Sequence, residues 1–472
     1  MNREYRTSAC RLLVRLSISF LFLPCAGASF AERPADFGRQ WVRSHPFSLT
    51  ALVQRPCAVA DDNYANLGLT HMLIWKEREP LFQAAGRMGM PWHLHINKRR
   101  AEKLKTEEYR EQIRNWIRSY PGCQAIIAWD EPIRPDMEKA AEALAWCRRE
   151  FPEKLIYSNA YPGGTHGKSL HKHYGARWIS SGVYADPGVH YTYDEYLTDY
   201  VRTLEPDVLC FDIYPFMIPP EGTTAEFLHT RYFTNMASVR RVALHEKLPY
   251  WVCVQAYSHE GGGGRRYPSE SDFRMQIYTA LTFGFTGIIY FTYDSAYKSG
   301  LLDGECDTPG RMYGYAQEMN AEIARIGGPL RFLTSTGVWY VPGRNALYGP
   351  TVDNLVPLGM EAFAGHDAIS EIRVEEEGVD QNGLIGFFTD DNGGRYFMLS
   401  NMRQGPELTA AAAEATFDIS FDADVKQLHR LSRETGEVEG IELREGQARI
   451  ALPGGTGDLF KFSDSSFPGE VE

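Results

Sequence analysis

Two adjacent carboxylates end an apolar run in the segment Ala125-Ile-Ile-Ala-Trp-Asp-Glu-Pro132. Such a run predicts a buried strand, so Asp130 and Glu131 follow directly on a strand end. Neighbouring carboxylates repel each other, and one of them can keep its proton at neutral pH. A protonated carboxyl can act as a general acid and protonate a leaving oxygen. A solvated loop whose acids cap the next helix is the simpler alternative, and we favour catalysis because of the strand-end position.

Polar and aromatic side chains also stand at the ends of the other apolar runs. Aromatic faces can stack on the C–H faces of sugar rings, and carboxylates and amides can bind hydroxyls. Each residue taken alone fits a core or rim position equally well. Together they predict a cleft for a hydroxyl-rich ligand, lined by Trp75, His93, His95, Trp129, Asn159, Tyr161, Tyr214, Gln255, Tyr257, Tyr293 and Asp294.

The spacing of His93 and His95 also suits two metal ligands on one strand. A metal-dependent barrel hydrolase would need further histidines after the fifth and sixth strands, where Asn159 and Asp212 stand instead. We therefore expect no metal and no other cofactor, and keep a metal-dependent hydrolase as the less favoured alternative.

These side chains are carried by a unit that recurs between about residues 45 and 325: an apolar run, a polar or Gly/Pro break, and a helix-period segment. Continuous apolar runs are typical of strands buried on both faces. No run is followed by a Gly-x-Gly-x-x-Gly turn, which disfavours an open dinucleotide-binding sheet. The eight runs predict a (β/α)8 TIM barrel in an α/β fold: Ser48–Val53, Thr70–Trp75, Pro91–Ile96, Ala125–Trp129, Leu155–Asn159, Val208–Tyr214, Tyr250–Ala256 and Gly287–Tyr293.

Beyond Gly328 the pattern changes to short strand-like runs between turn signals. Asp391-Asn-Gly-Gly394 is a hairpin turn signal, because Asn and Gly accept the positive φ of tight turns. We predict a barrel over residues 40–328 and a small antiparallel β-sandwich over residues 329–472. The sandwich strands are expected at Thr336–Val341, Ile372–Val374, Gly383–Thr389, Arg395–Asn401, Ala415–Phe421, Lys426–Leu431 and Ala448–Leu452.

The first residues have the features of an export signal. Four arginines precede the short apolar run Leu16–Leu23, and Ala26-Gly27-Ala28 supplies a small-x-small cleavage site. We therefore predict a signal peptide over residues 1–28 and a secreted or periplasmic protein. Cys25 leaves a lipoprotein as the less favoured alternative, because Pro24 replaces the small residue expected before a lipidated cysteine. No second apolar stretch of membrane length follows, so no membrane contact is expected after signal removal.

The net charge and the cysteine spacing limit which partners and metal sites the protein is expected to have. The formal net charge of -12 argues against nucleic acid, which needs a basic surface. The eight cysteines include no C-x-x-C pair of a zinc site. Disulfides are permitted after export, but the spacing does not determine a pairing.

Several segments resemble (β/α)8-barrel glycoside hydrolases. Asp130-Glu131-Pro132 resembles the acid position at the end of their fourth strand, and Asp207–Pro215 and Arg274–Tyr293 are similar to later segments of the same enzymes. Leu428–Phe460 resembles the β-domain that often follows such barrels. The resemblance covers most of the mature chain. It implies an exported hydrolase that cleaves O-glycosyl bonds of an oligo- or polysaccharide by carboxylate acid/base catalysis.

Two mechanisms fit this resemblance. In the first, Glu131 is the acid/base and a nucleophilic carboxylate lies about 5 to 5.5 Å away. The resemblance implies that the nucleophile follows the seventh strand, where this chain has Gln255 and, further on, Glu260. Asp212 after the sixth strand is the other candidate. The missing strand-seven glutamate leaves open a catalytically silent carbohydrate-binding barrel.

In the second mechanism the substrate's own 2-acetamido group is the nucleophile, as in some hexosaminidases. Glu131 would protonate the leaving group and Asp130 would orient the acetamido nitrogen. A tyrosine after strand six, seven or eight could hold the acetamido oxygen. Successive strand residues point to opposite faces, so only one of the two acids is expected to face the cleft unless the strand ends at Trp129.

Overall fold

The computed structural model describes residues 33–163, 184–186, 189–218, 228, 231–260, 264–294, 299–304, 308–343, 360–375 and 383–469. The predicted signal peptide lies outside these ranges. Asp36–Glu472 forms one compact unit, and a barrel and a β-sandwich are its two parts. Within the described ranges, no helix is long and apolar enough to cross a membrane.

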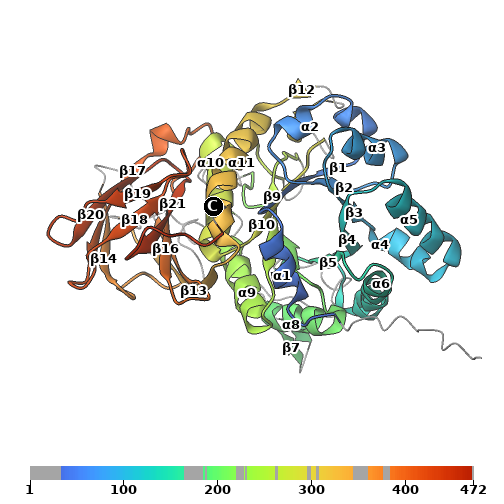
Figure 1. Cartoon of the computed structure of the whole chain (residues 1–472), viewed down its shortest axis with the longest axis horizontal. Helices are drawn as coiled ribbons and strands as arrows, with labels where there is room; N and C mark the ends of the chain where they lie inside the picture. Colours follow the sequence, from blue (N-terminus) through green and yellow to red (C-terminus); the bar gives the residue numbers. More distant parts are fainter. Residues whose placement is uncertain are drawn as a thin grey trace, which may run out of the picture. The chain divides into compact units, whose positions relative to one another are not determined.

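Eight parallel strands close into a barrel in the order β1-β10-β9-β8-β5-β4-β3-β2 (Figure 1). Every residue of β1, β5 and β9 is buried, which explains why these runs are apolar without alternation. All eight predicted strands are confirmed. Their bounds are β1 Ser48–Val53, β2 Met72–Ile74, β3 Trp92–His95, β4 Cys123–Asp130, β5 Leu155–Ala160, β8 Leu209–Asp212, β9 Tyr250–Gln255 and β10 Gly287–Phe291.

Side chains fill the inside of the barrel, and α1 (Phe37–Ser44) covers its amino end. Trp41 and Val42 of α1 belong to the same buried cluster as Tyr157, Trp251 and other inward residues of the strands. The Trp41 and Trp251 rings lie 6.1 Å apart between centroids. Because the interior is packed at this end, open space for a ligand is left at the carboxyl ends of the strands.

Helices surround the barrel. They are α2 Asn63–Asn66, α3 Glu79–Arg87, α4 Lys98–Ala101, α5 Glu107–Ser119, α6 Met137–Glu150, α8 Tyr193–Leu204, α9 Tyr232–His245, α10 Glu270–Phe283 and α11 Arg311–Leu330. Short 3-10 turns lie at η1 Pro56–Val59, η2 Glu102–Lys105, η3 Arg134–Asp136 and η5 Ala411–Ala413. Two small antiparallel pairs are β6 Tyr184–Asp186 with β7 Val189–Tyr191, and β11 Leu302–Asp303 with β12 Thr308–Pro309.

The carboxyl-terminal part consists of two antiparallel sheets. The larger has the order β13-β15-β16-β21-β18-β19, and the smaller has the order β14-β17-β20. The turn signal at Asp391 joins β15 to β16 as predicted, with Gly393 at φ 82°. The bounds are β13 Thr334–Val341, β14 Ile369–Glu375, β15 Gly383–Thr389, β16 Arg395–Asn401, β17 Ala415–Phe421, β18 Leu428–Leu431, β19 Val438–Ile441, β20 Gln447–Leu452 and β21 Gly457–Phe462. The sequence did not predict β19 and β21.

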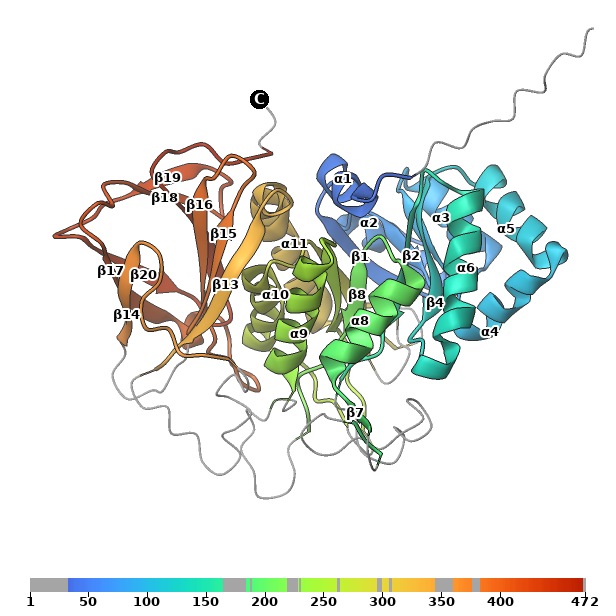
Figure 2. The same cartoon turned by 90° about the horizontal axis from the view of Figure 1, so that it is seen from below.

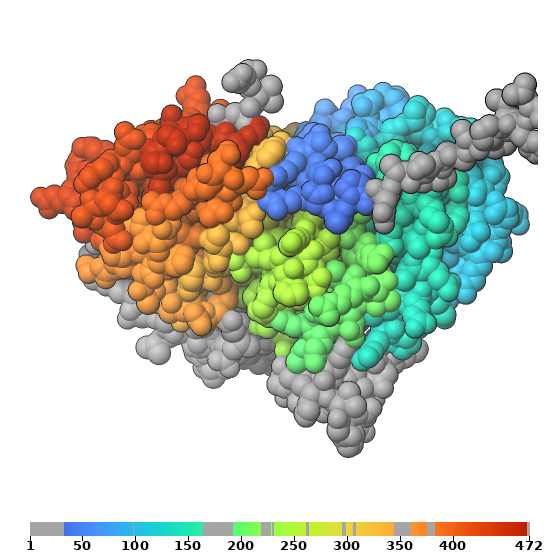
Figure 3. Space-filling view, turned by 60° about the horizontal axis from the view of Figure 1, so that its bottom comes forward, coloured from blue at the N-terminus to red at the C-terminus, as the bar shows by residue number. Residues whose placement is uncertain are grey.

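Helices α10 and α11 lie between the barrel strands and the larger sheet (Figures 1 and 2). Because α10 is covered on all sides, 13 of its residues are buried, from Ser271 to Phe283. At the surface, Arg39 and Arg43 of α1 donate hydrogen bonds to Asp391 in the β15–β16 turn, and Figure 3 shows α1 in blue beside the orange surface of the sandwich.

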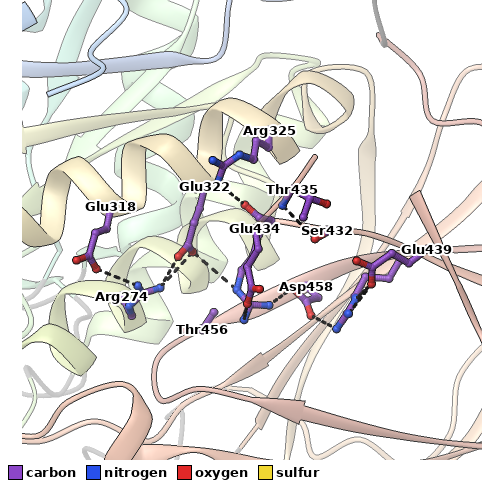
Figure 4. Close-up of polar contacts among 12 residues, drawn as sticks. Arg274, Glu318, Glu322, Arg325, Ser432, Glu434, Thr435, Glu439, Thr456 and Asp458 are labelled. Atoms are coloured by element: carbon purple, nitrogen blue, oxygen red, sulfur yellow. Dashed lines mark hydrogen bonds and ion pairs between the residues drawn. The ribbon is translucent and has the colours of Figure 1, made fainter. Parts of the chain in front are cut away.

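A buried ionic network extends from these helices into the sandwich (Figure 4). Glu322 of α11 accepts hydrogen bonds from Arg274 of α10 at 2.9 and 3.1 Å, and lies 3.9 Å from Arg433. Arg433 in turn binds Asp458, whose side chain is fully buried. Charged side chains therefore form part of the contact between the barrel and the sandwich.

Candidate active site

Two cavities lie at the carboxyl ends of the barrel strands. The inner cavity, of about 230 Å³, lies over the barrel interior. The outer cavity, of about 440 Å³, lies over the ends of β2, β3 and β4. Trp75, Asp130 and Glu131 line both cavities. Of the predicted site residues, these three line the cavities together with His95, Asn159, Tyr161, Asp212 and Tyr214.

The end of β4 brings both acids of the Asp130–Glu131 pair to the cavities. The pairing of β4 with β5 is irregular, because Ile127 pairs with Tyr157 whereas Asp130 already pairs with Asn159. One extra residue in β4 shifts the alternation, so that Ile127 and Asp130 both face inward.

Glu131 follows with φ at 46°, in the left-handed region, and its backbone N–H donates to the Asn159 carbonyl at 2.9 Å. A non-glycine residue in this conformation is uncommon, and such backbone strain is found most often at functional sites. The expectation that only one of the two acids could face the cleft was wrong, since strict alternation ends at the irregularity.

The Glu131 carboxyl is hydrogen-bonded to the carboxyl of Asp212. Burial, followed by the charges of Asp212 and Asp130, raises the pKa of Glu131 well above its ordinary value. Two carboxyls in contact cannot both be ionised without a large repulsion. Glu131 therefore holds the proton at neutral pH and donates it in the hydrogen bond to Asp212.

Asp212 lies at the end of β8 and is held by several donors. Asn159 Nδ2 donates to its Oδ1 at 2.8 Å, and Tyr214 and Glu131 also bind the carboxylate. Burial raises the pKa of Asp212 to about 6, and these hydrogen bonds oppose the rise. Asp212 is thus the ionised partner of the pair near neutral pH.

Two buried thiols that the sequence analysis did not select belong to this site. Cys210 and Cys253 line the inner cavity, and Cys210 Sγ donates to Asn159 Oδ1 at 3.5 Å. Cys253 Sγ lies 3.9 Å from the same oxygen. The contacts orient the Asn159 amide so that its nitrogen faces Asp212. No signal in the sequence distinguishes these cysteines from buried apolar residues.

Aromatic side chains form one wall of the inner cavity. Phe291 lies within 5.3 to 5.4 Å of the ring centroids of Trp75, Tyr214 and Tyr257. Such a wall offers flat apolar faces to a sugar ring. The sequence analysis did not select Phe291, because it lies within the apolar run of its strand and resembles a core residue.

His95 and Asp130 form a second polar contact at the cavities. His95 Nε2 lies 3.7 Å from Asp130 Oδ1, and the Asp130 side chain is 35% exposed. His95 is the only member of the predicted His93–His95 pair that lines a cavity. His95 therefore lies beside Asp130 at the inner cavity, whereas His93 lines neither cavity.

Gln255 does not face either cavity. Its amide nitrogen donates to the backbone carbonyls of Phe216, Tyr257 and Arg266, and its oxygen accepts from the Phe216 N–H at 2.9 Å. The fully buried amide joins three loop segments at the end of β9. Gln255 stands where the resemblance implies a nucleophile. In this chain its side chain instead has a structural role.

Other predicted site residues also lie away from the cavities. His93 is fully buried inside the barrel, stacked on His71 at 3.6 Å, and burial lowers its pKa well below the ordinary value. Trp129 lies on the outer side of β4 beside Trp146. Tyr257 contacts the aromatic wall but does not line the inner cavity, and Glu260 is exposed and lines neither cavity.

Tyr293 and Asp294 follow β10 and are also buried away from the cavities. Tyr293 packs edge-on against Tyr64 at 4.7 Å. Asp294 accepts a hydrogen bond from the Gln54 N–H at 2.9 Å, and burial raises its pKa to about 6. Both residues therefore join the end of β10 to the segment that follows β1.

No group of three or more His, Cys, Asp and Glu residues in the described ranges is arranged to hold a metal ion. Cys57 is disulfide-bonded, whereas Cys123, Cys147, Cys210 and Cys253 are free and buried. The functional groups at the cavities are carboxyls, amides, thiols, an imidazole, aromatic rings, and the ammonium and guanidinium groups of Lys76 and Arg99.

No family model matches the chain, and no curated protein sequence matches it. Solved structures of several glycoside hydrolases do match. A GH128 endo-β-1,3-glucanase from Amycolatopsis mediterranei is 13% identical over 57% of this chain and 98% of its own, with a TM-score of 0.34. A maltogenic α-amylase from Thermotoga neapolitana is 10% identical over 89% of this chain and 99% of its own, with a TM-score of 0.39. A GH10 xylanase from Thermobacillus composti is 12% identical over 58% and 97%, with a TM-score of 0.37.

Proposed function

We propose that the protein is an exported hydrolase of glycosidic bonds in an oligo- or polysaccharide, with Glu131 as its general acid/base. The observation that carries this proposal is the hydrogen-bonded carboxyl pair of Glu131 and Asp212 at the cavities. A buried carboxyl that keeps its proton at neutral pH is the group needed to protonate a leaving oxygen. Export rests on the amino-terminal sequence pattern.

In this proposal the proton of Glu131 passes to the glycosidic oxygen as the C–O bond breaks, and the bonding electron pair goes to that oxygen. The oxygen of a water molecule forms the new bond to the anomeric carbon and gives a proton to the Glu131 carboxylate, which restores the acid. Asp212 holds the Glu131 carboxyl in place and favours its protonated form. Trp75 and the aromatic wall provide the surface on which a sugar ring can stack.

The hydrogen bond between the two carboxyls bears on the choice of mechanism. Hydrogen-bonded oxygens lie about 2.5 to 3.0 Å apart, closer than the roughly 5 to 5.5 Å that separate acid and nucleophile in retaining glycosidases. We therefore assign Asp212 as the proton partner rather than the nucleophile. Asp130 faces the outer cavity beside Glu131, which supports the substrate-assisted mechanism, with Asp130 orienting a 2-acetamido group.

The test is turnover of aryl glycosides, with and without a 2-acetamido group, by the wild type and by Glu131→Gln. The variant keeps the side-chain shape, and we expect it to lose about 10²- to 10⁴-fold in kcat/KM. The loss should be largest for weakly acidic leaving groups, which depend most on protonation. Turnover confined to 2-acetamido sugars would support the substrate-assisted mechanism.

Glu260→Gln is the matched control, since this exposed carboxyl lines neither cavity, and near wild-type turnover is expected. Wild-type turnover by Glu131→Gln would refute the acid assignment. Binding of glycans by the wild type without any turnover would instead favour the silent carbohydrate-binding barrel.

A further inference from the structure

The outer cavity carries cationic side chains that the proposed chemistry does not use. Lys76 follows Trp75 after β2, and Arg99 lies in α4 after β3. Within the part of the chain that the structure describes, neither side chain has a carboxylate within 4.0 Å, whereas Arg100 beside them is paired with Glu77. Two cations without carboxylate partners thus line a cavity of a protein whose net charge is -12.

The surroundings add to the positive charge at this place. Burial, with the nearby guanidinium groups of Arg100 and Arg78, lowers the pKa of Lys76, while the charge of Asp130 acts in the opposite direction. Asp130 and Glu131 are the carboxyl groups among the residues that line the outer cavity, and burial and the neighbouring carboxylates raise the pKa of Glu131 well above its ordinary value. An anion bound between Lys76 and Arg99 would relieve the repulsion among these cations.

The remaining lining fits a sugar ring. Trp75 and Tyr161 supply aromatic faces, and Asn97 supplies an amide for hydroxyl groups. The Lys76 ammonium lies 4.6 Å from the centre of the Trp75 ring, so a ring stacked on Trp75 would bring its substituents close to this cation.

We propose that the outer cavity is a subsite for an acidic sugar, whose carboxylate or sulfate group is bound by Lys76 and Arg99. This inference rests on the proposed function and specifies its substrate class. Together with the role proposed for Asp130, it points to a glycan in which a 2-acetamido sugar neighbours a uronic acid or a sulfated sugar. Guanidinium and ammonium groups form charge-assisted hydrogen bonds with both kinds of anion.

The experiment measures binding by calorimetry in the Glu131→Gln background, which prevents turnover. The probes are hyaluronan and chondroitin sulfate oligosaccharides, each beside its carboxyl-reduced or desulfated counterpart. We expect at least one acidic oligosaccharide to bind about tenfold to hundredfold more tightly than its neutral counterpart at low salt. Lys76→Met with Arg99→Met should abolish this preference, so that the acidic oligosaccharide binds no more tightly than its neutral counterpart.

Lys103→Met with Arg444→Met is the matched control, because it removes the same two charges from positions that line neither cavity. Loss of preference on carboxyl reduction identifies a carboxylate, and loss on desulfation identifies a sulfate. Equal binding of charged and neutral forms, a preference that survives in the Lys76 and Arg99 variant, or no binding of either form would overturn the inference.

The outcomes separate this inference from the proposed function. If the wild type hydrolyses neutral glycans, Glu131→Gln does not, and no preference for acidic forms is found, the proposed hydrolase activity is supported and the acidic subsite is refuted. If the wild type hydrolyses none of the probes or aryl glycosides but binds acidic forms more tightly in a way that depends on Lys76 and Arg99, the acidic subsite is supported and the hydrolase activity is refuted.

Discussion

At the scale of single residues, the site depends on one shared proton. Glu131 lies where burial and two neighbouring carboxylates all oppose its ionisation. Asp212 is also buried, but Asn159 and Tyr214 donate hydrogen bonds to it and favour its charged form. The environments thus give the two carboxyls different protonation states, which is how general acids are usually distinguished from their partners.

A pH profile of kcat/KM should follow from this pair. The active form has Glu131 protonated and Asp212 ionised, so activity should fall below about pH 6, where Asp212 takes a proton. It should fall again at high pH, where Glu131 loses its proton, and the apparent pKa values belong to the pair. Asp212→Asn removes a negative neighbour, so the alkaline limb should move to lower pH.

Steady-state kinetics from about pH 4 to about pH 10 measure both limbs. Glu108→Gln, at an exposed carboxylate in the first turn of α5, should leave both limbs in place. An alkaline limb that stays fixed in Asp212→Asn would show that Asp212 does not control the proton of Glu131.

At the scale of elements, neighbouring strand ends have different roles. At the irregular end of β4, Asp130 and Glu131 both line the cavities. In contrast, Gln255, the last residue of β9, lines neither cavity. The Gln255 amide instead joins the backbone at Phe216, Tyr257 and Arg266. This buried amide stabilises the loops around the site by satisfying their backbone polar groups.

Gln255→Glu should therefore destabilise the protein without adding a catalytic group. A carboxylate would face three carbonyl oxygens where the amide now donates, so we expect a loss of about 2 to 4 kcal/mol in the free energy of unfolding. Urea unfolding measures this loss. The exposed Gln427→Glu should change stability by less than about 0.5 kcal/mol. Increased turnover by Gln255→Glu would contradict the structural role.

At the scale of the whole molecule, the barrel contacts the sandwich through charged side chains in addition to apolar packing. Asp458 of β21 is fully buried and binds both Arg430 and Arg433. Arg433 also approaches Glu322 of α11. Glu322 binds Arg274 of α10 (Figure 4) and accepts a hydrogen bond from Tyr278 of the same helix. A buried charge of this kind is tolerated only while its partners remain in place.

Arg433→Met should cost about 3 kcal/mol in the free energy of unfolding, because Asp458 would keep only Arg430 as a partner. The value of kcat/KM at 25 °C should be unchanged, since none of these residues lines either cavity. Chemical denaturation and kinetics of the same preparation check both statements. Arg444→Met, in an exposed pair with Glu442, is the control and should be nearly neutral. A variant as stable as the wild type would exclude the network as a stabilising contact.

The sequence predicted the barrel strands more completely than the sandwich strands. Barrel strands are buried on both faces, so each appears as an uninterrupted apolar run. In contrast, β21 contains Asp458 and Lys461, which are buried in the structure because they are paired with Arg433 and Asp464. Hydrophobic periodicity assigns charged residues to exposed positions, so it did not predict β21. It also did not predict β19, which is partly exposed.

The sequence by itself determined the eight strands, and with them the end of the barrel at which Asp130, Glu131 and Asp212 must lie. Parallel strands bring their carboxyl ends together, so this follows from strand order alone. Only the tertiary structure decided that Asp212 shares the proton of Glu131, that both acids of the pair face the cavities, and that Gln255 does not. These contacts depend on closure of the barrel and on one extra residue in β4, and hydrophobic periodicity contains no information on either.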